Sequence, residues 1–218
     1  MTQYLYRSGD PELAPVLLLH STGGDETELL QLAELLLPNH PVLAIRGRVN
    51  ENGYNRYFER YAEGQFNLAS LATETDWLYD ELIKLAAKFE LDVTRMIVIG
   101  YSNGANMALH MSLVKAVNFS TILAHHAMQL SEIAPIKADQ LSQTDIFLTY
   151  CHNDPIVSDD NFKHLVENLR AAGANPMLYT ENTGHQLSNN EIFGAQNFLQ
   201  KLEKSHNHPS NGWLVPRV

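Results

Sequence analysis

Short, continuously apolar runs alternate along the chain with longer segments in which apolar residues recur at helical spacing. Strands that are apolar on both faces are typical of a mostly parallel sheet with helices packed on each side. The pattern therefore predicts an α/β fold. Strands are expected at residues 16–20, 42–45, 96–99, 121–124, 146–150 and 177–180, and helices at 26–36, 76–89, 105–117, 162–171 and 192–202.

Residue types that end or begin helices mark several of these boundaries. Ser188 and Glu191 have the spacing of a capping box, Ser158 precedes the helix that runs through Leu169, and Gly173 is placed to end it. Residues 46–67, between a strand and a helix, show no clear periodicity. Connections of this length in compact domains are often functional.

The bulk composition fits one domain, which we expect to span residues 1–204. Residues 205–218 form a polar tail that is expected to be disordered, and its LVPR sequence resembles a protease site of the kind left by protein expression.

The charge and the apolar runs exclude several classes of partner. The net charge is -10, from 25 acidic and 15 basic residues, and no basic cluster is present that would follow a nucleic-acid backbone. The apolar runs are too short to span a membrane, and the first residues lack the pattern of a secretion signal. We therefore expect a cytoplasmic protein, and the single cysteine, Cys151, fits a reducing compartment.

The most informative motif is the stretch MIVIGYSNGANMALHM, from Met96 to Met111. A β-branched run is followed by Gly100-Tyr101-Ser102-Asn103-Gly104, and helix-forming residues come directly after this pentapeptide. In so tight a strand–turn–helix the glycines let the strand and helix pass closely, and the serine hydroxyl is held in the open. The pentapeptide alone is equally compatible with a catalytic serine and with an ordinary helix-capping serine. The distinction depends on whether a base and an acid are found elsewhere in the sequence.

A serine needs a base to remove its proton, and the base needs an acid to orient it. Asp154 follows the strand that ends at Tyr150, and Pro155 keeps it out of helical conformation. His185 follows the next strand. The order Ser102, Asp154, His185 is the order expected for a catalytic triad on this fold.

The reaction also requires donors for the oxyanion. The LHSTGGDE segment follows an early strand, and we expect the backbone N–H of Thr22 to act there together with the N–H of Asn103.

The segments LHSTGGDE, GYSNGAN, DPIV and GHQLS, with the arginine- and aromatic-rich stretch between residues 47 and 66, resemble the phospholipase/carboxylesterase family. The closest likeness is to its small bacterial MhqD-like carboxylesterases, which are related to acyl-protein thioesterases. The resemblance implies an α/β-hydrolase fold without a large lid domain, a triad of Ser102, Asp154 and His185, and no cofactor. Ser21 and Cys151 stand where relatives commonly have glycine.

These observations predict a serine carboxylesterase that acts on small to medium esters through an acyl-enzyme. The alternatives are an acyl-thioesterase or lysophospholipase, and a non-catalytic module that binds a small ligand. Arg48, Arg56 and Tyr101 are the candidates for substrate contact, although solvation also explains the arginines, Arg60 included. Whether the protein forms a homodimer is left open.

Other polar residues have simpler explanations than catalysis. Asp159 and Asp160 fit the first turn of a helix. Adjacent residues of a strand point to opposite faces, so His125 and His126 fit a structural role better than a metal site, and no metal site is predicted. Cys151 is expected to be packed, and Met107 and Met111, one helical turn apart, fit the core.

Overall fold

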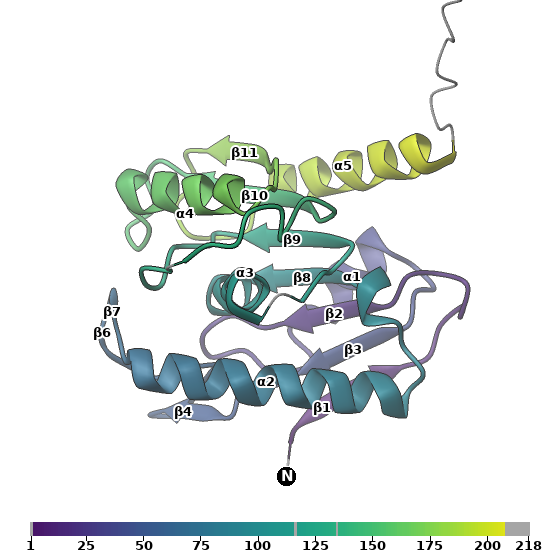
Figure 1. Ribbon diagram of the computed structural model, residues 1–218, viewed down its shortest axis with the longest axis horizontal. Coiled ribbons are helices and arrows are strands. Elements are labelled where there is room, and N and C mark those ends of the chain that lie inside the picture. The colour runs from purple at the N-terminus through teal and green to yellow at the C-terminus, as the bar shows by residue number, and fades with distance from the viewer. Residues whose placement is uncertain (1, 116, 134, 208–218) are drawn as a thin grey trace, which may run out of the picture.

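A seven-stranded sheet forms the centre of the structure, a computed structural model that describes residues 2–115, 117–133 and 135–207. β1 pairs antiparallel with β3 at one edge, and all other pairs are parallel. All six predicted strands are present, and β1 is an addition. In spatial order the strands are β1 (Tyr4–Arg7), β3 (Val42–Ile45), β2 (Val16–Leu19), β8 (Ile97–Tyr101), β9 (Thr121–His125), β10 (Asp145–Cys151) and β11 (Met177–Glu181) (Figure 1).

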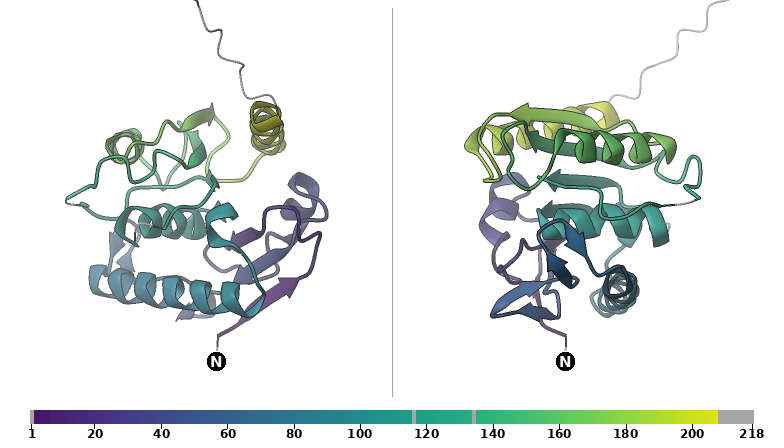
Figure 2. Two further views of the ribbon diagram at one scale, coloured as in Figure 1. Left: turned by 45° about the vertical axis from the view of Figure 1, so that its right-hand side comes forward. Right: turned by 90° about the vertical axis from the view of Figure 1, so that its left-hand side faces the viewer.

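Helices cover both faces of the sheet, as predicted (Figure 2). α2 (Leu68–Lys88), α3 (Asn103–Lys115) and α4 (Asp159–Ala171) pack on one face, and α1 (Leu30–Leu36) and α5 (Asn189–Asn207) on the other. Alternate residues of each strand supply the two cores, because successive side chains of a strand point to opposite faces. Leu17 and Leu19 join the first core, whereas Val16 and Leu18 join the second.

All five helices begin at other residues than the apolar pattern predicts, and the difference is largest for α2 and α1. α2 begins at Leu68 rather than 76, where Asn67 accepts a hydrogen bond of 3.2 Å from the Ser70 N–H. α1 begins only at Leu30. The residues before it form a turn in which Asp25 accepts a hydrogen bond of 2.8 Å from the Thr27 N–H. A short 3-10 helix, η1 (Val93–Arg95), precedes β8.

The predicted capping residues are confirmed. The Ser188 hydroxyl accepts from the Glu191 N–H at 3.1 Å, and the Ser188 N–H donates to the Glu191 carboxylate at 2.8 Å. Ser158 accepts from the Asn161 N–H at 3.2 Å at the start of α4. Gly173, with φ of 91°, follows the end of that helix.

Residues 46–67, which show no clear periodicity in the sequence, form regular structure. They contain two short hairpins, β4 (Val49–Glu51) with β5 (Tyr54–Arg56) and β6 (Arg60–Ala62) with β7 (Gln65–Phe66). Asn52 and Gly53 turn the first with positive φ of 53° and 95°, the turn chemistry of a tight hairpin. Strands of two or three residues are too short for alternation to show. Both hairpins lie on the side of the sheet where the carboxyl ends of the parallel strands are found (Figure 1).

The C-terminal end of the described chain is helical. α5 continues to Asn207, beyond the residue at which a disordered tail was expected to begin, and residues 208–218 lie outside the described part. None of the helices in the described residues combines the length and apolar character that a membrane span needs.

The close passage of α3 beneath β2 yields a prediction for stability. A Cβ at Gly104 would clash with the backbone carbonyl of Leu19, which cannot move without displacing β2. Gly104→Ala should therefore lower the free energy of unfolding by about 3 kcal/mol or more. Gly53→Ala is the control, since nothing lies within 4 Å there and only the positive φ is strained, at a cost of about 1 kcal/mol. Urea denaturation measures both, and equal losses would contradict the prediction.

Candidate active site

The turn between β8 and α3 holds Ser102 in a strained backbone conformation. Its φ is 49°, in the left-handed region that non-glycine residues rarely adopt, and its N–H donates to the His125 carbonyl at 2.8 Å. A Cβ at Gly100 would lie 2.7 Å from Cα of Ala105, so the strand and the helix pass as closely as the motif predicted. The turn presents the Ser102 hydroxyl at the carboxyl edge of the sheet.

The structure brings together Ser102, Asp154 and His185. The Ser102 hydroxyl lies 2.8 Å from Nε2 of His185, and Nδ1 of His185 lies 2.7 Å from Oδ2 of Asp154. Ser102 follows β8, Asp154 follows β10 and His185 follows β11, so three separate strand ends supply the group. The geometry is that of a serine hydroxyl facing a base that a carboxylate orients.

The Asp154 carboxylate is fully buried and heavily hydrogen-bonded. Oδ1 accepts from the N–H groups of Ile156 at 2.8 Å and Val157 at 3.1 Å. Burial by itself would raise the pKa of Asp154. The nearby His126 ring and the hydrogen bonds from His185 and the Ile156 N–H outweigh burial and hold the pKa of Asp154 well below its usual range. Asp154 is therefore ionised at neutral pH.

The loop after β2 is held beside Ser102 by polar contacts on both sides. Ser21 donates to the Glu28 carboxylate from its N–H at 2.7 Å and from its hydroxyl at 2.6 Å. On the hairpin side, Gly23 N–H donates to the Asn55 carbonyl at 2.9 Å. None of the described residues accepts a hydrogen bond from the Thr22 N–H, which leaves that amide open to a ligand.

The amide of Asn103 is one of the first N–H groups of α3, which have no acceptor within their own helix. The Asn103 side chain is buried, and its Oδ1 accepts from the Tyr57 N–H at 2.8 Å. This contact ties the start of α3 to the segment between the two hairpins.

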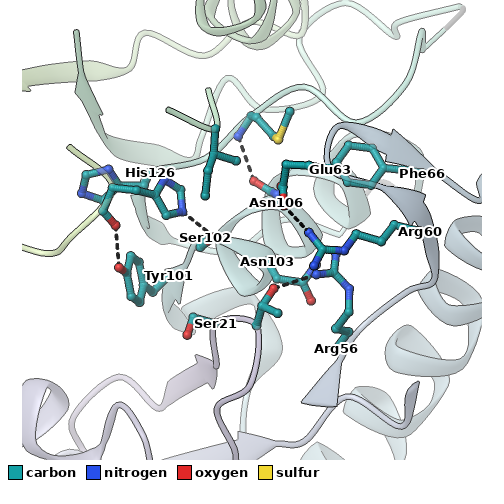
Figure 3. Close-up of a pocket in the computed structure, with 14 residues that line it drawn as sticks. Ser21, Arg56, Arg60, Glu63, Phe66, Tyr101, Ser102, Asn103, Asn106 and His126 are labelled. Atoms are coloured by element: carbon teal, nitrogen blue, oxygen red, sulfur yellow. Dashed lines mark hydrogen bonds and ion pairs between the residues drawn. The ribbon is translucent and has the colours of Figure 1, made fainter. Parts of the chain in front are cut away.

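A cavity of about 290 Å³ opens above Ser102. In Figure 3, Tyr101 and His126 lie on one side of Ser102, and Arg56 and Arg60 approach from the other. The lining residues are Ser21, Thr22, Arg56, Arg60, Glu63, Phe66, Tyr101, Ser102, Asn103, Asn106, His126, Met128, Ile156 and His185.

Of the residues expected to contact substrate, two reach this cavity and one does not. Arg56 is 3% exposed and Tyr101 donates from its hydroxyl to the His185 carbonyl at 2.6 Å. Arg48 instead pairs with Glu74 at 2.7 Å, lies over the Trp77 ring, and lines a different cavity. The sequence alone could not separate the two arginines, because both flank the same hairpin.

A model of the phospholipase/carboxylesterase family matches residues 62–203 of this chain. The chain belongs to the phospholipase/carboxylesterase family. It is 31% identical over 199 residues to MhqD of Bacillus subtilis (strain 168), an assigned hydrolase, covering 91% of this chain and 98% of that protein.

Solved structures of relatives share the fold over nearly the whole chain. YahD, whose structure was solved with malic acid, is 46% identical with a TM-score of 0.88, over 92% of this chain and 99% of that one. A Bacillus cereus carboxylesterase is 35% identical with a TM-score of 0.87, over 92% of this chain and 94% of that one. The α/β-hydrolase fold that the motifs predicted is thereby confirmed.

Sequence reasoning about this family member missed the role of His126 and Glu191. His126, with φ of 54°, follows β9, and its Nδ1 lies 3.5 Å from Oδ2 of Asp154. Its Nε2 lies 3.0 Å from Oε1 of Glu191 in α5. Both side chains are fully buried. The position of His126 after a strand end was the available signal, but Glu191, in the first turn of α5, was interpreted only as a capping residue.

Two groups of side chains come close enough to hold a metal ion. His126 contributes to both, with Asp154 and His185 in one and with Cys151 and Glu191 in the other, and the ligand atoms lie within 4.8 Å of one another. In the first group, Nδ1 of His185 is already bonded to Oδ2 of Asp154, and in the second, Nε2 of His126 is hydrogen-bonded to Glu191.

The remaining polar residues occupy structural positions. Asp159 and Asp160 lie in the first turn of α4, as expected, and Asp159 accepts from the Tyr150 hydroxyl at 2.6 Å. Cys151 is buried, with Sγ 3.3 Å from the Thr183 hydroxyl oxygen. Met107 and Met111 are fully buried in the core.

The environment of His126 predicts how stability depends on pH. Burial would lower its pKa, but the ion pairs with Asp154 and Glu191 raise the pKa to about 9. Since the unfolded value is about 6.5, the folded state binds this proton more tightly. The resulting stabilisation, on the order of 3 kcal/mol, is complete below about pH 6.5 and is lost as pH rises through about 9.

Urea denaturation of wild type and His126→Gln at pH 6 and pH 10 measures this contribution. Wild type should lose more stability between the two pH values than the variant does. His125→Gln is the matched control, because burial lowers the pKa of His125 to about 4 and its ring stays neutral throughout. A wild-type dependence no steeper than that of His126→Gln would contradict the prediction.

Proposed function

We propose that this family member is a serine carboxylesterase that hydrolyses small carboxylic esters through an acyl-enzyme. The observation that carries the proposal is the continuous line of contacts from Ser102 Oγ through His185 to Asp154, at 2.8 Å and 2.7 Å. The line opens into a cavity of about 290 Å³, a volume suited to a small substrate.

In the proposed reaction, Ser102 Oγ attacks the ester carbonyl while Nε2 of His185 takes its proton. Asp154 accepts from Nδ1–H, which fixes the imidazole tautomer and stabilises the imidazolium. The N–H groups of Thr22 and Asn103 would donate to the oxyanion.

The tetrahedral intermediate then collapses. The C–O bond to the alcohol breaks, and His185 delivers its proton to the leaving oxygen. Water attacks the acyl-enzyme with His185 as base, and the carbonyl–Oγ bond breaks. The protonated His185 returns the proton to Ser102, releasing the acid and the free enzyme.

Ser102→Ala should reduce kcat for p-nitrophenyl acetate by about a thousand-fold or more, since it removes the nucleophile. The fold should be retained. Ser112→Ala is the matched control, because Ser112 is a buried serine of α3, the helix that follows Ser102, and its hydroxyl donates to the Ala108 carbonyl. A panel of p-nitrophenyl esters of increasing chain length, measured on both variants and wild type, gives the size of the acyl site.

Two alternatives have different outcomes in the same set of assays. A thioesterase would turn over acyl thioesters faster than matched oxygen esters. A module that only binds its ligand would hydrolyse neither, and its serine would not react with a fluorophosphonate probe. Rapid labelling of wild type but not of Ser102→Ala supports an activated serine, and absence of labelling would overturn the proposed function.

The cavity wall favours an ester that carries a carboxylate. Arg56 is nine-tenths buried or more, yet the carboxylate of Glu51 is 3.9 Å from its Nη1, too far for a hydrogen bond. Its other contacts are neutral, to the Thr22 hydroxyl at 2.9 Å and the Phe58 carbonyl at 3.2 Å. A buried guanidinium is stabilised by an anionic partner. The binding of malic acid, a dicarboxylic acid, by the relative YahD supports this substrate class.

Arg56→Gln should raise KM for monomethyl succinate about tenfold more than KM for methyl butyrate, because only the first ester carries a charge for Arg56 to bind. Hydrolysis is followed by pH-stat titration of the acid released. Arg48→Gln is the matched control, since Arg48 pairs with Glu74 outside the cavity, and it should leave both KM values unchanged. Equal increases for the charged and neutral esters would count against a carboxylate-bearing substrate.

A further inference from the structure

Directly behind the candidate triad, an imidazole is enclosed between two buried carboxylates. Nδ1 of His126 faces Asp154 at 3.5 Å, and Nε2 faces Glu191 at 3.0 Å. Oδ2 of Asp154, the atom that accepts from His185, is the same atom that faces His126. The contacts therefore continue from Ser102 through His185, Asp154 and His126 to Glu191.

We propose that His126, with Glu191 as its counter-charge, is a positioning residue that holds the Asp154 carboxylate in the orientation that His185 requires. This rests on the proposed function of the triad. It extends that function to His126, which follows β9, and to Glu191 in α5, neither of which touches the reacting Ser102 hydroxyl.

The placement of His126 between two carboxylates favours a protonated ring, because Nε2 is hydrogen-bonded to Glu191 and Nδ1 lies at ion-pair distance, 3.5 Å, from Oδ2 of Asp154. A neutral imidazole has one N–H and one lone pair, so one of the two carboxylates would face a lone pair. Only the imidazolium places a donor before each acid. The raised pKa of His126, about 9, agrees with this arrangement. A neutral ring would also leave two anions buried without a cation between them, which is costly.

Both ends of the contact are held in place by the fold. The His126 N–H donates to the Thr149 hydroxyl of β10 at 3.1 Å, and its backbone stays in the left-handed region at φ of 54°. Glu191 is fixed by the capping box, through the Ser188 N–H. A strained residue whose position is determined from several sides is typical of functional sites.

The summed charge of Asp154, Glu191, His126 and His185 also changes during the proposed reaction. At rest, Asp154 and Glu191 are anions and His126 is a cation, a sum of one negative charge. Protonation of His185 in the transition state brings the sum to zero. Without the His126 charge, the two anions would attract a proton onto His185 more strongly, and the resting base would be lost at a higher pH. The titratable groups that face the His126 ring are Asp154, Glu191, Cys151, His185, Tyr101 and the neighbouring His125.

Three variants test the proposal: His126→Gln, Glu191→Gln and the double variant. Each is measured by the pH dependence of kcat and KM for p-nitrophenyl acetate and of the rate of fluorophosphonate labelling. His126→Gln should lower kcat about tenfold at pH 7.5, with KM nearly unchanged, as expected for loss of a charged group that orients Asp154 from behind. The acid limb of its kcat–pH profile should move to higher pH. The loss of kcat relative to wild type should shrink above pH 9, where wild-type His126 loses its own proton.

Glu191→Gln removes the counter-charge that holds the proton on His126. The alkaline limb of the kcat–pH profile should therefore lie closer to neutral pH in this variant than in wild type. In the double variant no further alkaline shift is expected, because the titrating ring is absent. His125→Gln is the matched control. Its side chain contacts the Phe147 ring and not the two acids, so neither limb should move.

Several results would overturn the inference. One is a loss of kcat in His126→Gln that is the same from pH 6 to pH 10, with the acid and alkaline limbs of the kcat–pH profile unchanged. Substitution of a purely structural residue would give this result. Should the variants not fold, the ¹⁵N shifts of the wild-type imidazoles decide. Two protonated ring nitrogens on His126 at pH 7.5 support the inference, and a neutral ring overturns it. Absence of wild-type hydrolysis and labelling would instead refute the proposed function itself.

Discussion

The close passage of α3 against the strand ends is the constraint on which the site depends. Gly100 and Gly104 leave no room for a side chain, so the chain must reverse direction within the residues between them. Ser102 takes the positive φ that this reversal demands. The strain is compensated by the buried helix and strands on either side, and it leaves the hydroxyl at the edge of the sheet instead of in the core.

A parallel sheet then brings the other groups to the same place. The carboxyl ends of its strands lie at one edge, so residues that follow β8, β10 and β11 become neighbours although they are far apart in the chain. β9 ends at this edge too, and the residue that follows it is His126. The edge therefore gathers a serine, a carboxylate and two histidines, and the buried carboxylate of Glu191 from α5 completes the charge arrangement.

The sequence predicted the fold well because its signals were local or set by chain order. Apolar runs located all six parallel strands, and the capping residues at Ser158 and Ser188 were identified correctly. The edge strand β1 and the two small hairpins were missed. Their strands have two to four residues, and they are too short or too exposed to show a hydrophobic period.

The site residues that could be predicted from the sequence are those that a motif, or the order of the strands, identifies. Ser102, Asp154 and His185 met both conditions, and the structure places them in contact. His126 met neither, because its significance comes from Glu191, which lies in another element and whose sequence context explains it fully as a cap. Such a pairing across the sheet becomes visible only in three dimensions.

The first hairpin would connect the proposed substrate recognition to the proposed catalysis through a single side chain. Arg56 of β5 donates to the Thr22 hydroxyl, and the Thr22 N–H is a proposed oxyanion donor. The neighbouring Asn55 holds Gly23 and Gly24 of the same loop, with contacts of 2.9 Å and 2.8 Å. An anion bound by Arg56 would therefore pull on the residue that stabilises the transition state. On this arrangement, binding energy from a remote carboxylate is available to raise kcat as well as to lower KM.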